Sequence, residues 1–304
     1  MSRSILLFLA LNLTFLIIGF ITNGMSLQIQ LIVAVFLMAL VGIPHGAIDH
    51  VLFFQNTKRS PILFYTLYFG LITVTVIVWL LNPKIGFILF VSLSSYHFGQ
   101  SQFSQKNLLH KSLKVILYFA WGSSILSALC VYNKQEIIEI TSTTADLFVL
   151  QPLFTNHLFP IALWVSSSIF FIILLTQFRK LKQANIGMEI VIFMLVHLSF
   201  YFHSAILGFS IFFVSIHSFD VLLQEFKFLT TRFNKFTLKK FIGLLAPYTL
   251  VSVFGMGFLV LLSHIEVLDI SKTLLIFISI AALTLPHSIV MENFYRAVKP
   301  GINN

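Results

Sequence analysis

The sequence predicts an all-α, polytopic transmembrane helical bundle of about ten spans. Of its 304 residues, 58% are hydrophobic and only 10% are charged, and the mean hydropathy is +0.97. Such a composition lacks the polar surface that a water-soluble globule needs. Apolar runs of about 17 to 24 residues, each long enough to cross a bilayer as a helix, recur along the whole chain.

Each predicted span is bounded by short polar or charged segments. In order, the spans are 5–22, 28–48, 61–81, 85–103, 113–132, 158–178, 186–204, 207–224, 242–263 and 272–294. No convincing small-residue cleavage site follows the first run, so we expect it to stay as a span. The longest predicted loops are 133–157, a candidate interfacial segment, and 225–241, which is basic. No second domain is visible, and we expect a single integral-membrane domain over residues 1–304.

The charge distribution predicts the orientation of these spans. The chain has 19 Lys and Arg residues against 10 Asp and Glu residues. When the spans are threaded with both termini on one side, only Lys84, Lys134 and Lys272 fall on the opposite side. Cytoplasmic loops carry the excess of Lys and Arg, so we expect both termini in the cytoplasm and the protein in the cell inner membrane. The basic residues lie in short clusters between spans, so they do not predict nucleic-acid binding.

Residues 42–50, Gly-Ile-Pro-His-Gly-Ala-Ile-Asp-His, interrupt the second span with proline and ionisable groups. Pro44 should kink the helix because it lacks a backbone N–H. Asp49 follows His45 by four residues, which on a helix places a carboxylate beside an imidazole. Ionisable groups inside a membrane segment are costly and usually functional. We therefore interpret this segment as a buried active site; a polar helix end at the interface is the alternative.

Four histidines on four spans are predicted to lie at similar depth. Counted at about 1.5 Å per residue, His45, His97, His217 and His287 lie about 15 to 26 Å from the outer end of their helices, in a core of about 30 Å. All four therefore fall in the cytoplasmic half. His50 lies deeper, near the inner interface, whereas loop histidines such as His157 are expected to be solvated.

Polar residues at helical spacing give two of these histidines a candidate partner. Gln100 follows His97 by three residues, and Asp220 follows His217 by three. Histidines from separate helices without cysteine suit iron, copper or zinc. The chain has one cysteine, Cys130, which excludes an intramolecular disulfide and a cysteine-rich metal site. The pattern predicts a metal centre inside the membrane.

The motifs around these histidines resemble those of a known family. They are Gly-Ile-Pro-His-Gly-Ala-Ile-Asp-His at 42–50, His-Phe-Gly at 97–99, Ile-His-Ser at 216–218 and Leu-Pro-His at 285–287. In this order and spacing they are similar to the Brp/Blh family of bacterial and archaeal integral-membrane β-carotene 15,15′-dioxygenases. The resemblance extends from residue 42 to the last span.

This resemblance implies an activity and a cofactor. The family uses a non-haem iron(II) held by histidines and O2 as co-substrate, and cleaves β-carotene centrally into two all-trans-retinal molecules. By motif match, His45, His97 and His217 would be iron ligands. A further family ligand falls at Val221, which cannot bind metal. The fourth position would then be taken by His50, Asp220 or His287, or it would have no protein ligand in this member. Asp49 is expected to hydrogen-bond an imidazole.

The expected partners follow from the same resemblance. β-Carotene would enter from the lipid bilayer, since an apolar polyene dissolves there, and the product retinal could pass to a retinal-binding rhodopsin. A family member that acts on another carotenoid is one alternative. A haem-binding electron-transfer protein is a second alternative, because paired histidines also ligate haem. A transporter would instead place ionisable residues along the full membrane depth.

Overall fold

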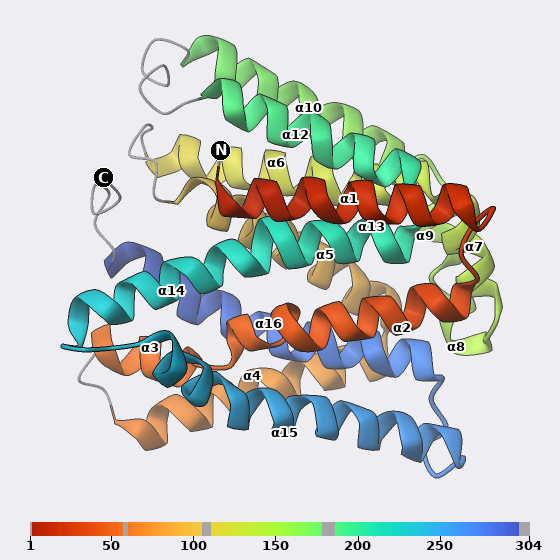
Figure 1. Ribbon diagram of the computed structural model, residues 1–304. Helices are drawn as coiled ribbons and strands as arrows, with labels where there is room; N and C mark the ends of the chain where they lie inside the picture. The colour runs from red at the N-terminus through yellow and green to blue at the C-terminus, as the bar shows by residue number, and fades with distance from the viewer. Residues whose placement is uncertain (1, 57–59, 105–110, 178–185, 298–304) are drawn as a thin grey trace.

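The chain folds as a bundle of long helices that run roughly side by side (Figure 1). The computed structural model describes residues 2–56, 60–104, 111–177 and 186–297, and no strand occurs within these ranges. The all-α, polytopic prediction is therefore confirmed. In chain order the elements are α1 (Arg3–Ile21), α2 (Leu27–Leu37), η1 (Met38–Gly42), η2 (Pro44–Gly46), α3 (Asp49–Asn56), α4 (Pro61–Leu81), α5 (Pro83–Phe103), α6 (Lys111–Tyr132), α7 (Lys134–Ser142), α8 (Ala145–Phe148), α9 (Gln151–Thr155), α10 (Leu158–Thr176), α12 (Ile186–Phe202), α13 (Ala205–Phe212), η4 (Phe213–Ser218), α14 (Phe219–Arg232), α15 (Leu238–His264) and α16 (Lys272–Ala297).

All ten predicted spans are helical, and eight helical segments of the described chain are long and apolar enough to cross a membrane. The other two predicted spans are α12, which is a shorter apolar helix of 17 residues, and α5. Helix α5 has 21 residues but carries Ser, Tyr, His and Gln side chains in its second half. The protein is thus a multi-pass membrane protein by length and composition, and a count of ten crossings stays a prediction.

Two predicted boundaries differ from the structure. The loop 133–157 contains the short helices α7, α8 and α9, which cover one end of the bundle (Figure 1). The span predicted to end at residue 224 continues to Arg232, because α14 buries an apolar face that includes Phe228 and Leu229 while Lys227 and Arg232 are exposed. The basic segment 225–241 is therefore mostly helix rather than loop.

Several helices begin at a side chain that accepts a hydrogen bond from the first turn. Ser2, Ser26 and Ser204 accept from the backbone N–H of Ile5, Ile29 and Leu207. Asn82 accepts from Ile85 N–H at 3.1 Å, and Pro83 at the first helical position needs no partner. These caps fix where α1, α2, α13 and α5 start.

The start of α1 and the ends of α14 and α16 lie at one end of the bundle (Figure 1). Arg3, Arg232 and Arg296 belong to these helix ends, which agrees with the predicted clustering of positive charge. The location of this end in the cytoplasm, and of the protein in the inner membrane, stays a prediction.

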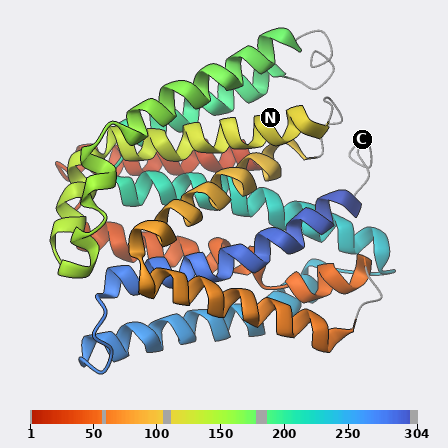
Figure 2. The same cartoon turned by 180° about the vertical axis from the view of Figure 1, so that it is seen from behind.

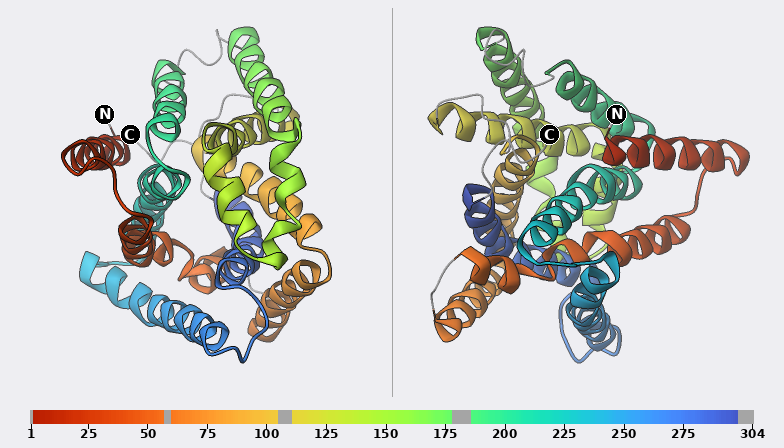
Figure 3. Two further views of the ribbon diagram at one scale, coloured as in Figure 1. Left: turned by 90° about the vertical axis from the view of Figure 1, so that its right-hand side faces the viewer. Right: turned by 60° about the vertical axis from the view of Figure 1, so that its left-hand side comes forward.

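The middle of the bundle is formed by α5, α6, α13, α14 and α16. Seen along the helices, α16 and α14 lie inside, whereas α1 and α15 lie at the rim (Figure 3). From behind, α5 crosses diagonally between α6 and α4 (Figure 2). The rim helices expose most of their apolar side chains, as lipid-facing helices do.

Helices α5 and α6 touch through their backbones. A Cβ atom added at Gly99 would lie 2.0 Å from the carbonyl oxygen of Tyr118, and one at Gly122 would lie 1.9 Å from that of Ser95. Only glycine permits this approach. The contact flanks His97 on both sides in the sequence, so it fixes the position of the His97 side chain in the bundle.

Candidate metal centre

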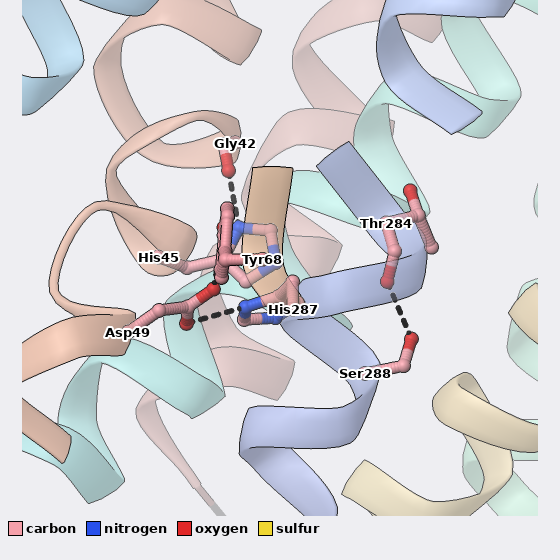
Figure 4. Close-up of polar contacts among 7 residues, drawn as sticks. All are labelled: Gly42, His45, Asp49, Tyr68, Thr284, His287 and Ser288. Atoms are coloured by element: carbon pink, nitrogen blue, oxygen red, sulfur yellow. Dashed lines mark hydrogen bonds and ion pairs between the residues drawn. The ribbon is translucent and has the colours of Figure 1, made fainter. Parts of the chain in front are cut away.

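His45 lies where the second span loses regular α-helical geometry. Residues Met38–Gly42 form a π-helical turn in which Ile43 N–H donates to the Met38 carbonyl at 2.7 Å, and Pro44–Gly46 form a 3-10 turn in which Gly46 N–H donates to Ile43. The Gly42 carbonyl thereby loses its usual partner, Gly46 N–H, and the Nδ1–H of His45 donates to it instead (Figure 4). The ring is held in the tautomer that leaves Nε2 free to bind a metal.

His217 lies in a second π-helical segment, Phe213–Ser218, between α13 and α14. Its Nδ1 is 3.0 Å from the Ser101 hydroxyl oxygen. Ser101 donates its own hydrogen to the Phe98 carbonyl at 2.9 Å, so it accepts from His217. The Nε2 atom of His217 is buried and, among the described residues, has no hydrogen-bond partner. π-Helical turns occur frequently at functional sites.

His287 follows Pro286 inside α16. Its Nδ1–H donates to the Asp49 carboxylate at 2.8 Å, and the second oxygen of Asp49 accepts from the Tyr68 hydroxyl at 2.9 Å (Figure 4). Ser288, the next residue, donates to the Thr284 carbonyl at 2.7 Å (Figure 4). The His287 Nε2 atom is buried without a partner in the described chain.

The four histidine rings form one compact cluster. Ring centroids are 4.8 Å apart for His45 and His287, 5.0 Å for His287 and His97, 4.9 Å for His97 and His217, and 5.1 Å for His217 and His45. Neighbouring rings are nearly perpendicular. Ligand atoms of His45, His97 and His287 all lie within 4.8 Å of one another. All four side chains are buried.

This arrangement fits a metal ion. Three of the rings have their Nδ1–H occupied, by a carbonyl, a hydroxyl and a carboxylate, which is how proteins orient metal-binding imidazoles. The Nε2 atoms of His97, His217 and His287 are buried and unpaired within the described residues. A buried polar atom without a partner costs about 1 to 3 kcal/mol, and a shared cation would remove that cost for all of them.

Other sequence candidates lie differently. Asp49 contacts His287 rather than His45, because the broken helix does not keep the four-residue spacing that a regular helix would give. Asp220 accepts from Ser4 at 2.8 Å and from Gln224 at 2.8 Å, so its hydrogen bonds are not directed to His217. The half-buried ring of His50 packs on Tyr248, at 4.6 Å between centroids.

Two residues that contact the cluster were not identified from the sequence. Ser101 follows His97 by four residues on α5, and this spacing predicts a contact with His97 rather than with His217 of another helix. Tyr68 belongs to α4, whose apolar composition gives no sign of a site. Neither residue stands out in a pattern of ionisable groups, and both reach the site through tertiary packing.

A polytopic helical bundle with a buried cluster of four histidines has a donor set that could bind a metal ion inside a membrane. The β-carotene 15,15′-dioxygenase family model matches residues 36–295, and the chain therefore belongs to this family of oxidoreductases. A β-carotene 15,15′-dioxygenase of the uncultured marine bacterium 66A03 is 26% identical over 275 residues, which cover 86% of this chain and 93% of that protein. No solved structure matches the chain significantly. The family resemblance inferred from the histidine motifs is thus confirmed.

Proposed function

We propose that the protein is an iron(II)-dependent dioxygenase that cleaves β-carotene centrally with O2 into two all-trans-retinal molecules. The observation that carries this proposal is the clustering of the His45, His97, His217 and His287 rings inside an apolar bundle, with ligand atoms of His45, His97 and His287 close enough to share one ion. The family assignment supports the substrate class. In this proposal His287 is the fourth ligand, which is supported by its buried, unpaired Nε2 atom and its place in the cluster.

The residues of the chain have two tasks around the metal. The four imidazoles would hold iron as neutral ligands, which keeps the net charge of the buried site low. Iron supplies the binding and activation of O2 when it is bound. Gly42, Ser101 and Asp49 fix the orientation of three rings by accepting their Nδ1–H groups.

The overall reaction balances with β-carotene and O2 alone. The central carbon–carbon double bond breaks, and each of its two carbons gains one oxygen atom from a single O2 molecule. No net proton or electron is consumed, so the site does not need an acid, a base or a reductant for the balance. The rings of Phe98 and Phe213 pack against His217, with centroids at 4.8 and 5.3 Å, and help to exclude water.

The geometry argues against the haem alternative. A porphyrin occupies four positions around its iron with its own nitrogens, and histidine binds only above or below the plane. Four imidazoles whose neighbouring centroids are about 5 Å apart leave no space for such a plane between them. The transfer of retinal to a rhodopsin and action on another carotenoid stay predictions.

The test is expression in bacteria that accumulate β-carotene, followed by chromatography for retinal. We expect retinal with the parent chain, none with His287→Ala, and the parent amount with His157→Ala, whose side chain is exposed. Cleavage products of another length would redirect the proposal to a different bond. A Soret absorption band in the purified protein would contradict the iron–histidine site.

A further inference from the structure

His97 differs from the other three histidines of the cluster. Among the described residues, neither its Nδ1 nor its Nε2 atom has a hydrogen-bond partner. A metal can satisfy only one of these two nitrogens. The other nitrogen would stay buried and unpaired, at a cost of about 1 to 3 kcal/mol, unless a neighbouring side chain accepts its hydrogen.

Gln100 has the matching unpaired atom. It lies three residues after His97 on the buried side of α5, and its carbonyl oxygen Oε1 is buried without a partner in the described chain. Residues three apart on a helix are surface neighbours. One hydrogen bond from His97 Nδ1–H to Gln100 Oε1 would satisfy both atoms and would leave His97 Nε2 for the metal.

The orientation of the Gln100 amide is fixed from the opposite direction by Glu292 of α16. The Gln100 Nε2–H group donates to Glu292 Oε2, which also accepts from the Tyr96 hydroxyl at 2.8 Å. Since a carboxylate accepts and does not donate, the NH2 end of Gln100 faces Glu292 and the carbonyl end is left for another donor.

Arg296 in turn holds Glu292. Its Nε–H donates to Glu292 Oε1 at 2.6 Å, and its Nη2 lies 2.6 Å from the same oxygen. The Arg296 side chain is 65% exposed and that of Glu292 is 27% exposed, so the pair lies at the surface end of this chain of contacts. The observed contacts run from an exposed cation on α16 to the buried amide of Gln100 on α5.

We infer that Gln100 is a positioning residue for His97, and that Glu292 and Arg296 hold its amide in the productive orientation. This inference rests on the proposed metal site. It gives His97 the Nδ1–H acceptor that His45, His217 and His287 already have, and it assigns a role to the Glu292–Arg296 pair.

The chain offers a matched control two residues away. Gln102, also on α5, donates to Glu189 of α12 at 2.6 Å. Gln100→Leu and Gln102→Leu therefore each break one Gln–Glu hydrogen bond made by the same helix. Only the first removes the acceptor for His97.

The experiment titrates each purified full-length variant with Co(II), which reports its ligands through its visible ligand-field spectrum. We expect Gln100→Leu to bind Co(II) about 10- to 100-fold more weakly than the parent, the usual loss for an outer contact of a metal ligand, and with an altered spectrum. Gln102→Leu should keep the parent affinity and spectrum. Glu292→Gln, which retains an acceptor for Gln100 but loses the pairing with Arg296, should fall between the two.

Each outcome decides one question. Parent protein that binds no Co(II) would overturn the metal site itself. Parent binding together with an unchanged affinity and spectrum in Gln100→Leu would overturn the role of Gln100 alone. Equal weakening in Gln100→Leu and Gln102→Leu would also overturn it, since the effect would then be one of helix packing. If Gln100→Leu does not fold, an unchanged Glu292→Gln variant would overturn the inference.

Discussion

Asp49 allows a sharp test of the site, because one carboxylate that is 3% exposed joins His287 to Tyr68. Asp49→Asn keeps the side-chain size and removes the charge. The amide oxygen can still accept the N–H of His287, but as a neutral group. A hydrogen bond to a charged group contributes about 1.5 to 3 kcal/mol and a neutral one about 0.5 to 1.5 kcal/mol. The difference of about 1 to 1.5 kcal/mol corresponds to about a tenfold loss of metal affinity.

Two companion variants bracket this value. Asp49→Leu removes both acceptor oxygens and leaves His287 Nδ1–H unpaired, so the loss of metal affinity should approach about 100-fold. Tyr68→Phe removes only the phenol and leaves the 2.8 Å contact between Asp49 and His287, so its loss should be smaller than that of Asp49→Asn. Affinity is measured by anaerobic iron(II) titration, and retinal formation is measured in parallel. An Asp49→Leu protein with parent affinity would refute the reasoning.

Three further predictions address the ligands, the packing and the pH dependence. His287→Ala should abolish product and lower the metal content while folded protein stays in the membrane. The control His157→Ala should match the parent. A His287→Ala protein that still binds metal and forms product would show that His287 is not a ligand. Gly99→Ala should destabilise the protein by several kcal/mol, since its Cβ would lie 2.0 Å from the Tyr118 carbonyl oxygen. Thermal unfolding measures this loss, and the control variant Gly255→Ala, whose Cβ would meet nothing within 4 Å, should unfold at nearly the same temperature as the parent. Burial raises the pKa of Glu136 in α7, outside the long helices, although Ala205 N–H partly opposes this by donating to it. The folded state therefore keeps the Glu136 proton to a higher pH than the unfolded state, so stability should fall as the pH rises from about 4.5 through the folded pKa, and Glu136→Gln should remove this part of the pH profile.

Hydropathy predicted the helices well, because the length and apolar content of a span are local properties. The breaks inside the spans were harder to predict. Pro44 indicated a kink, but the π-helical turn before it and the one that carries His217 have no comparable signal. A π-helical turn depends on packing against neighbouring helices, which the sequence of one helix does not encode.

The site was predictable to the extent that depth along a helix can be counted. Similar depth brought His45, His97, His217 and His287 together as candidates, and the structure places all four rings in one cluster. The polar partners were less predictable, since helical spacing suggested His45 for Asp49 and His217 for Asp220. Contacts between helices decide both cases: α3 meets α16 at Asp49 and His287, and α1 meets α14 at Ser4 and Asp220.

The central claim is that four histidines of this chain hold one iron ion. Iron X-ray absorption spectroscopy on the purified, iron-loaded protein measures this most directly, because scattering from imidazole rings is distinctive. The account predicts one iron per chain with about four imidazole nitrogens at about 2.0 to 2.2 Å, the range typical of metal–imidazole bonds, and a lower imidazole count in the His287→Ala variant. A porphyrin signature, a shell of carboxylate oxygens alone, or iron that stays unbound would contradict it.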